Sequence, residues 1–164
     1  MIQDSGNRRE FDTGAVRDIQ EGKGRCDLLP LDVVSNLKYF EAGSSKKFVL
    51  VCIEKYMRTG EETILLDLIA EFSMNHFGDI PTAVLEVAKH FEEGCNKYGE
   101  RNWQKGIPLH CYIDSAIRHY LKFLRGDDDE RHDRAFLWNL LCCLWTQKNK
   151  PELIDLPFAQ NEDK

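Results

Sequence analysis

Apolar residues recur every three or four positions along several stretches of the chain, as they do on the buried face of an amphipathic helix. Such stripes run through residues 61–72, 81–97 and 113–124. Pro81 stands at the start of the second stretch, and a glycine follows each of the last two. Proline favours the first turn of a helix and glycine its end, so the pattern predicts three successive helices.

Two other apolar stretches are less regular. Residues 134–145, RAFLWNLLCCLW, are apolar nearly all the way round a helix, which predicts a helix inside the core. Residues 47–57 fit a helix or a strand by composition, and we favour a helix. Within residues 81–97 the buried stripe is expected to consist of Val84, Ala88, Phe91 and Cys95. Without a strong hairpin signal, the predicted fold class is all-α, a helical bundle.

The two ends of the chain lack this periodicity. The first 27 residues are rich in glycine and charged side chains and are expected to form an irregular arm. Residues 148–164 contain two prolines and end in charges, which predicts a C-terminal arm or tail. The length of 164 residues suits one domain with one core. We therefore expect a single domain over residues 1–164.

Composition excludes several classes of protein. The net charge of −6 argues against a sequence-independent grip on nucleic acid, which needs many Lys and Arg side chains to displace counterions. No apolar run approaches the roughly 18 residues of a membrane span, and the polar N-terminus lacks a signal-peptide core. Six cysteines without a C-x-x-C pair are typical of reduced thiols. We expect a cytoplasmic protein with no nucleic-acid or membrane partner.

Carboxylates lie at the edges of two of the predicted helices. Glu92 shares a helical face with Leu85 and Ala88, which would bring it to the border of the core. Asp114 precedes Arg118 by four positions on the next helix. A structural ion pair is the simplest role for these two residues, and a functional site is the alternative.

A dense group of ionisable residues precedes the predicted core helix. Asp129, Glu130, His132 and Asp133 occupy about one turn, where acids are often only helix caps. Carboxylates on facing bundle helices are also what Mg²⁺ requires, because it takes oxygen ligands and keeps waters that a base can deprotonate. Together with the acids of the two preceding helices, this group predicts a Mg²⁺ (or Mn²⁺) site.

The loop KYGERNWQKGIP is locally cationic and aromatic in an acidic chain. Lys97, Arg101 and Lys105 could donate charge-assisted hydrogen bonds to phosphate. Tyr98 or Trp103 offers a flat face for a base, although Trp103 could equally well close the core. Beside a metal site, this loop predicts a nucleotide with a polyphosphate tail as the ligand.

Four blocks of sequence carry a resemblance to a known family: TGAVRDIQEGKGRCDLLP, HFEEGCNKYGERNWQKGIP, DSAIRHYLKFLRG and DDDERHDRAFLWNLL. With them the chain resembles the dATP/dGTP diphosphohydrolases of phages and prophages, which are distantly similar to the MazG-like all-α nucleoside triphosphate pyrophosphohydrolases. The resemblance implies Mg²⁺-dependent cleavage between the α and β phosphates of a purine deoxynucleoside triphosphate, which yields the monophosphate and pyrophosphate. It also implies a homo-oligomer, and it marks residues 34–82 as an additional helical segment.

The same resemblance assigns roles to residues. The implied catalytic positions are Glu92, Asp114 and Glu130. The implied metal ligands are Glu92, Asp114, Asp129, Glu130 and Asp133. The implied substrate-binding positions are Lys97, Arg101, Asn102, Arg118, His119 and Asn139. The chemistry of the residues adds Tyr98, Trp103 and Lys105 of the cationic loop and Lys23 and Arg25 of the GKGR segment as further candidates for substrate binding. In this interpretation His132 supports a carboxylate site without binding the metal itself.

Two other functions stay open. The adjacent His132 and Asp133 suggest an HD-type metal phosphohydrolase, with His119 and Asp114 as possible further ligands. A stoichiometric transition metal, and orthophosphate or triphosphate as product, would favour that class. A helical module that senses nucleotides without hydrolysing them is the non-catalytic alternative, and an assay for pyrophosphate release distinguishes it from an enzyme.

Overall fold

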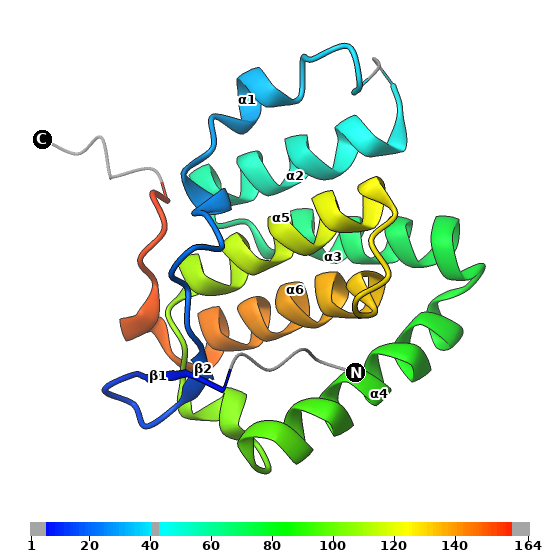
Figure 1. The fold of residues 1–164 in the computed structure, drawn as a ribbon. Coiled ribbons are helices and arrows are strands. Elements are labelled where there is room, and N and C mark those ends of the chain that lie inside the picture. Colours follow the sequence, from blue (N-terminus) through cyan, green and yellow to red (C-terminus); the bar gives the residue numbers. More distant parts are fainter. Residues whose placement is uncertain (1–5, 41–42, 159–164) are drawn as a thin grey trace, which may run out of the picture.

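The computed structural model describes residues 6–40 and 43–158 and is built mainly from helices (Figure 1). The α-helices are α1 (Leu31–Val34), α2 (Ser45–Thr59), α3 (Glu62–Phe72), α4 (Ile80–Tyr98), α5 (Leu109–Arg125) and α6 (His132–Asn149). Shorter helical segments are η1 (Cys26–Leu28), η2 (Ser73–Phe77), η3 (Asn102–Lys105) and η4 (Pro151–Leu153). Strands β1 (Arg8–Glu10) and β2 (Val16–Asp18) form an antiparallel hairpin. The predicted all-α bundle is confirmed.

Helices α5 and α6 form the centre of the bundle and run side by side in opposite directions (Figure 1). Helix α5 buries the stripe that its sequence predicts, including Ile113, Ile117 and Tyr120. It ends at Gly126, whose φ of 83° lies in the left-handed region that glycine adopts without strain. Helix α6 is buried on most of its sides, as a helix that is apolar all round must be. Both predicted helices are confirmed.

Helices α2 and α3 form a second antiparallel pair that packs on this centre (Figure 1). The stretch that fitted either a helix or a strand is helical, and α2 ends at Gly60 with a φ of 70°. Their buried side chains include Ile53, Tyr56, Leu65 and Leu68. No helix among the described residues is both long enough and apolar enough to cross a bilayer.

Helix α4 begins and ends where the sequence predicts. Pro81 lies in its first turn, and the Asp79 side chain caps it by accepting a hydrogen bond from the backbone N–H of Thr82 at 2.6 Å. Gly99 follows its last residue. These are local signals, because caps depend on residues within one turn of the helix end.

The predicted buried face of α4 is wrong. Val84, Ala88 and Cys95 are exposed, whereas the buried residues of the helix are Ala83, Val87 and His90. Two adjacent stripes of this helix contain apolar residues, and contact with α6 decides which of them is buried. The sequence periodicity predicts the helix correctly, but it does not distinguish these two stripes.

The N-terminal segment is more ordered than the predicted irregular arm. In the β1–β2 hairpin, Arg9 pairs with Arg17 across the two strands. The Asn102 side chain fixes β2 from outside, because it accepts a hydrogen bond from Val16 N and donates one to Val16 O, both at 2.9 Å. Strands of three residues are too short to show an alternating pattern, so the pairing depends on this contact from a distant part of the chain.

More of the C-terminal segment packs against the core than the sequence predicts. Helix α6 continues to Asn149, and apolar side chains beyond it, including Ile154, Leu156 and Phe158, pack against the core. The Phe158 ring lies edge-on to Tyr56, with centroids 5.7 Å apart. The two prolines end the helix but leave these apolar side chains free to pack. Residues 159–164 of the predicted tail lie outside the described residues.

Candidate functional site

A cavity of about 850 Å³ lies where the β1–β2 hairpin, α4, η3, α5 and α6 meet. The aromatic residues of its wall are Phe91, Tyr98, Trp103 and Trp138. The charged residues of its wall are Arg9, Arg17, Asp18, Lys23, Glu100, Arg101, Asp114, Arg118, Lys122, Asp129 and Glu130. A concave site that combines aromatic surface with several cations suits a ligand that has both a flat ring and negative charge.

Arg9 and Arg17 both line this cavity, and neither forms an ion pair with a carboxylate in the described part of the chain. Arg17 donates hydrogen bonds to Ser115 Oγ and Asn139 Oδ1, each at 3.1 Å. Arg9 donates to Cys111 Sγ at 3.2 Å, and its buried Nε atom has no hydrogen-bond partner in the described structure. Like charges opposite each other on paired strands repel, so an anion bound between the two guanidinium groups would stabilise this arrangement.

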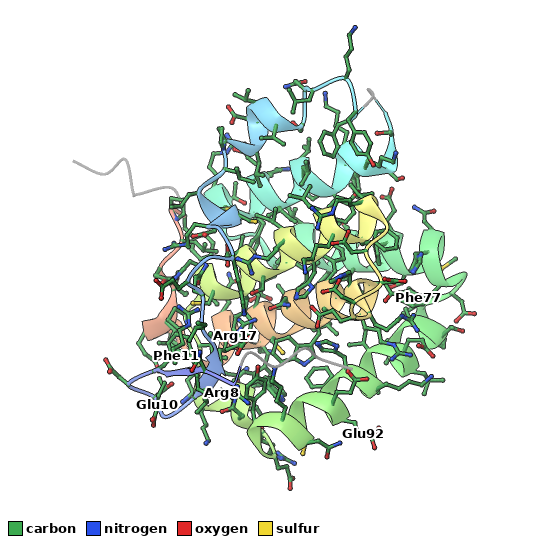
Figure 2. All side chains as sticks on the ribbon, viewed as in Figure 1. Arg8, Glu10, Phe11, Arg17, Phe77 and Glu92 are labelled. Carbon is green, nitrogen blue, oxygen red and sulfur yellow. The ribbon has the colours of Figure 1, made fainter. Side chains whose placement is uncertain are left out.

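Neither arginine is among the site residues predicted from the sequence. Figure 2 shows Arg17 where the N-terminal segment crosses the central helices, and its contacts with α5 and α6 place it there. One local signal could have revealed the hairpin: the Asp-Thr-Gly turn at residues 12–14, in which Gly14 has a φ of 78°. A glycine-containing turn between two short polar segments is compatible with a hairpin.

Asp114 and Arg118 form a clamp that holds the segment after β2 against α5. Asp114 Oδ1 accepts a hydrogen bond from Cys26 N at 2.5 Å. Its Oδ2 atom accepts a hydrogen bond from Gln20 Nε2 at 2.7 Å and forms an ion pair with Arg118. Arg118 also donates to the carbonyl oxygen of Gly24 at 2.8 Å. Both carboxylate oxygens are therefore already engaged by protein donors, which favours the structural role over metal binding.

His119 from α5 meets Glu130 and His132 at the start of α6, and these three residues could hold a metal ion. The two histidine Nδ1 atoms lie 3.0 Å apart, and Glu130 Oε1 lies 3.3 Å from that of His119 and 3.7 Å from that of His132. Burial lowers the pKa of His119 well below its usual value. Its imidazole is therefore neutral near pH 7 and can offer a lone pair.

Asp129 lies behind this group and contacts it through His132. Its Oδ1 atom lies 2.8 Å from His132 Nε2, and its Oδ2 atom accepts a hydrogen bond from Lys122 Nζ at 3.2 Å. A second potential metal group consists of Asp127, Asp129 and His132. Of the carboxylates predicted to bind the metal, Asp129 and Glu130 each belong to one of these two potential metal groups.

The donor set differs from the one that the sequence analysis expected. Mg²⁺ prefers oxygen ligands, whereas His119 and His132 offer imidazole nitrogens and only Glu130 offers an oxygen. These residues therefore fit Mg²⁺ poorly and fit divalent ions that accept imidazole, among which Mn²⁺ takes nitrogen least readily.

Aromatic side chains from α4, η3 and α6 form one wall of the cavity. Phe91 lies 5.5 Å from Trp103 and 5.8 Å from Trp138, measured between ring centroids. His90 packs against Trp138 at 5.7 Å, and burial lowers its pKa to about 4. This histidine is therefore neutral near pH 7 and belongs to the apolar wall.

Replacing Trp103 by alanine is expected to lower the free energy of unfolding by about 3 kcal/mol, the lower end of the usual range for tryptophan, because the residue is only half-buried. Its ring packs edge-on against Phe91 and against Trp145, at 5.0 Å from the latter. Urea unfolding followed by circular dichroism measures the loss, and Trp103→Phe serves as the control that keeps most of the packing. Unchanged stability together with a raised KM for purine nucleotides would instead show that Trp103 stacks on the base.

Most of the predicted site residues line the cavity. They are Lys23, Tyr98, Arg101, Asn102, Trp103, Asp114, Arg118, His119, Asp129, Glu130 and Asn139. Several of these already have structural partners: besides Asp114 and Arg118, Asn102 holds β2, and the Asn139 amide donates to Ala135 O at 2.8 Å while accepting from Arg17. The structure thus assembles a large part of the predicted substrate surface, and some of it serves to position other groups.

Glu92 is not part of this assembly. Its side chain is exposed on α4 and points away from the other helices (Figure 2). The expectation that it borders the core is therefore wrong, for the same reason that the predicted buried face of the helix is wrong. Glu92 does not line the cavity, and the potential metal groups among the described residues do not include it.

Three predicted phosphate-binding cations also lie outside the cavity wall. Arg25 is paired with Asp27, with its Nε atom 2.7 Å from Oδ1. Lys97 lies over the Tyr98 ring, with its Nζ atom 5.1 Å from the centroid. Lys105 Nζ is 3.5 Å from the carbonyl oxygen of Gly14. Arg9 and Arg17, which were not predicted, line the cavity instead.

Asp133 faces a different part of the molecule from its neighbour His132. Its Oδ2 atom accepts hydrogen bonds from Arg131 at 2.7 Å and His76 at 2.9 Å. Although burial alone would raise the pKa of Asp133, these hydrogen bonds lower it to about 2. The adjacent His-Asp pair of an HD-type site is therefore not brought to one metal group, although His119 and His132 are.

A family model described as dATP/dGTP diphosphohydrolase, N-terminal, matches residues 54–156. The match covers more than half of the 164 residues, and the chain belongs to this family. It includes α3 and part of α2, so the segment that the resemblance set apart as additional lies partly within the family region. The block at residues 13–30, which contains Arg17, precedes the matched range. Searches of curated proteins and of solved structures found no match.

Proposed function

We propose that this cavity binds a purine deoxynucleoside triphosphate and hydrolyses it between the α and β phosphates, which releases pyrophosphate. The observation that carries the proposal is the pair Arg9 and Arg17, two guanidinium groups that have no carboxylate partner among the described residues and that lie on the wall of an aromatic cavity. The family to which the chain belongs is described as a diphosphohydrolase of dATP and dGTP, which agrees with this ligand.

The phosphate tail is assigned to the cationic side of the cavity. A guanidinium group binds phosphate through paired N–H donors, and Arg17 is oriented by the neutral acceptors Ser115 and Asn139. Because neither acceptor neutralises its charge, the full positive charge remains available to the ligand. Lys122 also lines the cavity and donates to Asp129, which contacts His132, and it is expected to contact the terminal phosphates.

The base is assigned to the aromatic wall. Tyr98 at the end of α4 and Trp103 in η3 both line the cavity, and Trp103 packs against Phe91. Base–aromatic stacking contributes about 1–3 kcal/mol per base and is strongest for extended ring systems. A purine therefore suits this wall better than a pyrimidine.

With the base on the aromatic wall and the phosphates on the cationic side, the bond between the α and β phosphates would lie near the start of α6. When bound there, a divalent ion would supply charge stabilisation and a water of lowered pKa. The side chains around that point hold the triphosphate in one orientation and screen the charge that develops on pyrophosphate as it leaves. No covalent intermediate is required.

The experiment is a hydrolysis panel on the full chain with each dNTP and each NTP, with Mg²⁺ and Mn²⁺ tested separately. We expect the purine deoxynucleoside monophosphate and pyrophosphate in equal amounts. Hydrolysis in ¹⁸O-labelled water should place the label in the monophosphate, because the water attacks the α phosphorus. Glu130→Gln protein, purified in parallel, should be inactive and so exclude a contaminating phosphatase.

Other product patterns would contradict the proposal. Orthophosphate or triphosphate as product would assign the chain to the HD-type reaction class. Tight nucleotide binding without turnover would make the chain a nucleotide-sensing module. That second candidate has one observation in its favour, because the matching family model describes the N-terminal part of the diphosphohydrolases.

A further inference from the structure

We infer that His119, Glu130 and His132 bind one divalent transition-metal ion of the class that accepts imidazole nitrogen, such as Co²⁺, Ni²⁺ or Zn²⁺, in preference to Mg²⁺. The inference rests on the proposed function for its catalytic meaning, since it names the metal class of the same cavity. The metal site can be tested without any nucleotide, so the metal inference and the proposed function can fail separately.

The three donor atoms already form a compact triangle. Its edges are 3.0 Å between the two Nδ1 atoms, 3.3 Å from His119 Nδ1 to Glu130 Oε1, and 3.7 Å from His132 Nδ1 to the same oxygen. Ligands about 2.1 Å from a common ion lie about 3.0–3.4 Å apart when the angle between them is 90–109°. The triangle therefore needs little rearrangement to bind an ion on its open side.

The facing imidazoles themselves point to a cation. His132 Nε2 lies 2.8 Å from the Asp129 carboxylate and so carries a proton, which in a neutral ring leaves a lone pair on Nδ1. That lone pair faces His119 Nδ1. Without an ion, His119 must be held in the tautomer whose Nδ1–H group donates a hydrogen bond to His132 Nδ1. A bound cation satisfies both nitrogens together.

Asp129 is placed as an orienting residue. Histidines that bind metals usually donate their other N–H group to a carboxylate, which fixes the ring and raises its basicity. The Asp129–His132 contact has this arrangement, and Lys122 holds the second oxygen of Asp129. Because His132 is 2% exposed, its ring has little freedom to turn away from His119.

The donor types decide the class of ion. Two imidazole nitrogens and one carboxylate suit first-row transition ions, whereas Mg²⁺ is a hard ion that prefers oxygen and keeps its waters. Thiolates could compete for soft ions, but the cysteine that lines the cavity, Cys95, is outside both groups that could hold a metal in the described chain. A nitrogen–oxygen shell is therefore expected.

The test measures bound metal on full-length, tag-free protein stripped with a chelator. Isothermal titration with Co²⁺ should give one site per chain, with affinity more than about 100-fold above that for Mg²⁺. His119→Gln should weaken Co²⁺ binding by more than about 100-fold, and Asp129→Asn by about 10- to 100-fold. His110→Gln, a histidine outside the cavity that pairs with Asp155, should leave binding unchanged.

A second measurement keeps the inference falsifiable if a variant fails to fold. X-ray absorption of the Co²⁺-loaded wild-type protein should show the scattering of imidazole rings and no sulfur. Mg²⁺ binding as tight as that of Co²⁺, a shell of oxygen or sulfur alone, no bound ion, or a folded His119→Gln protein that binds Co²⁺ like the wild type would each overturn it.

Discussion

Replacing Arg17 by alanine is expected to lower kcat/KM for the preferred purine deoxynucleoside triphosphate by about 10- to 150-fold, because a charge-assisted hydrogen bond to phosphate is worth about 1.5–3 kcal/mol. Arg17 lines the cavity, is held by Ser115 and Asn139, and has no carboxylate partner in the described structure. Steady-state kinetics with the preferred nucleotide measures the loss. Arg17→Lys keeps the charge but not the paired donors, so its kcat/KM should lie between those of the wild type and of Arg17→Ala.

A ligand series separates phosphate binding from hairpin packing. The affinity lost in Arg17→Ala should grow from the nucleoside to the mono-, di- and triphosphate. Arg58→Ala on α2, an exposed arginine outside the cavity, is the matched control and should bind the whole series like the wild type. A variant that is less stable but binds the triphosphate normally would assign Arg17 to packing alone and remove the main support for the proposed ligand.

Replacing Asp114 by alanine is expected to lower the free energy of unfolding by about 3 kcal/mol, because breaking a buried ion pair leaves the remaining charge and donors unpaired. Asp114 is 1% exposed and engages Arg118, Gln20 and the backbone N–H of Cys26. The partial exposure of Arg118 sets the effect at the lower end of the usual range. Urea unfolding followed by circular dichroism measures it.

The same variants decide between a clamp and a metal ligand at this position. Asp114→Asn keeps one acceptor oxygen and should lose less stability than the alanine variant. It should still bind Co²⁺ like the wild type, because the described metal groups do not include Asp114. Asp67→Ala, an exposed acid on α3, serves as the control for stability. Loss of the metal with unchanged stability would restore the metal-ligand assignment.

Local sequence signals determined the helices of this protein. Periodic apolar residues predicted α3, α4 and α5, and a nearly continuous apolar run predicted α6. Pro81, Gly99 and Gly126 marked helix ends within one turn of where they occur. These features depend on neighbours three or four positions away, so a single sequence contains them. The acidic group before α6 could likewise be predicted as a candidate site, because its members are adjacent in the chain.

Which side chains share the site could not be read from the same signals. His132 and Asp133 are neighbours on one helix, yet the first faces α5 and the second faces η2. About 100° of rotation separates successive helical residues, so the orientation of α6 against its neighbours selects the one that reaches the candidate metal group. In the same way, the orientation of α4 against α6 left Glu92 exposed.

The arginines of the N-terminal hairpin were decided only by the tertiary structure. Nothing periodic marks Arg9 and Arg17, and their strands are held by contacts with residues such as Asn102 and Asn139, far along the chain. Contacts between distant segments form only when packing brings the segments together. The sequence by itself therefore determined the helices and the chemical types available, whereas packing of the hairpin on α5 and α6 determined which cations, acids and imidazoles face one cavity.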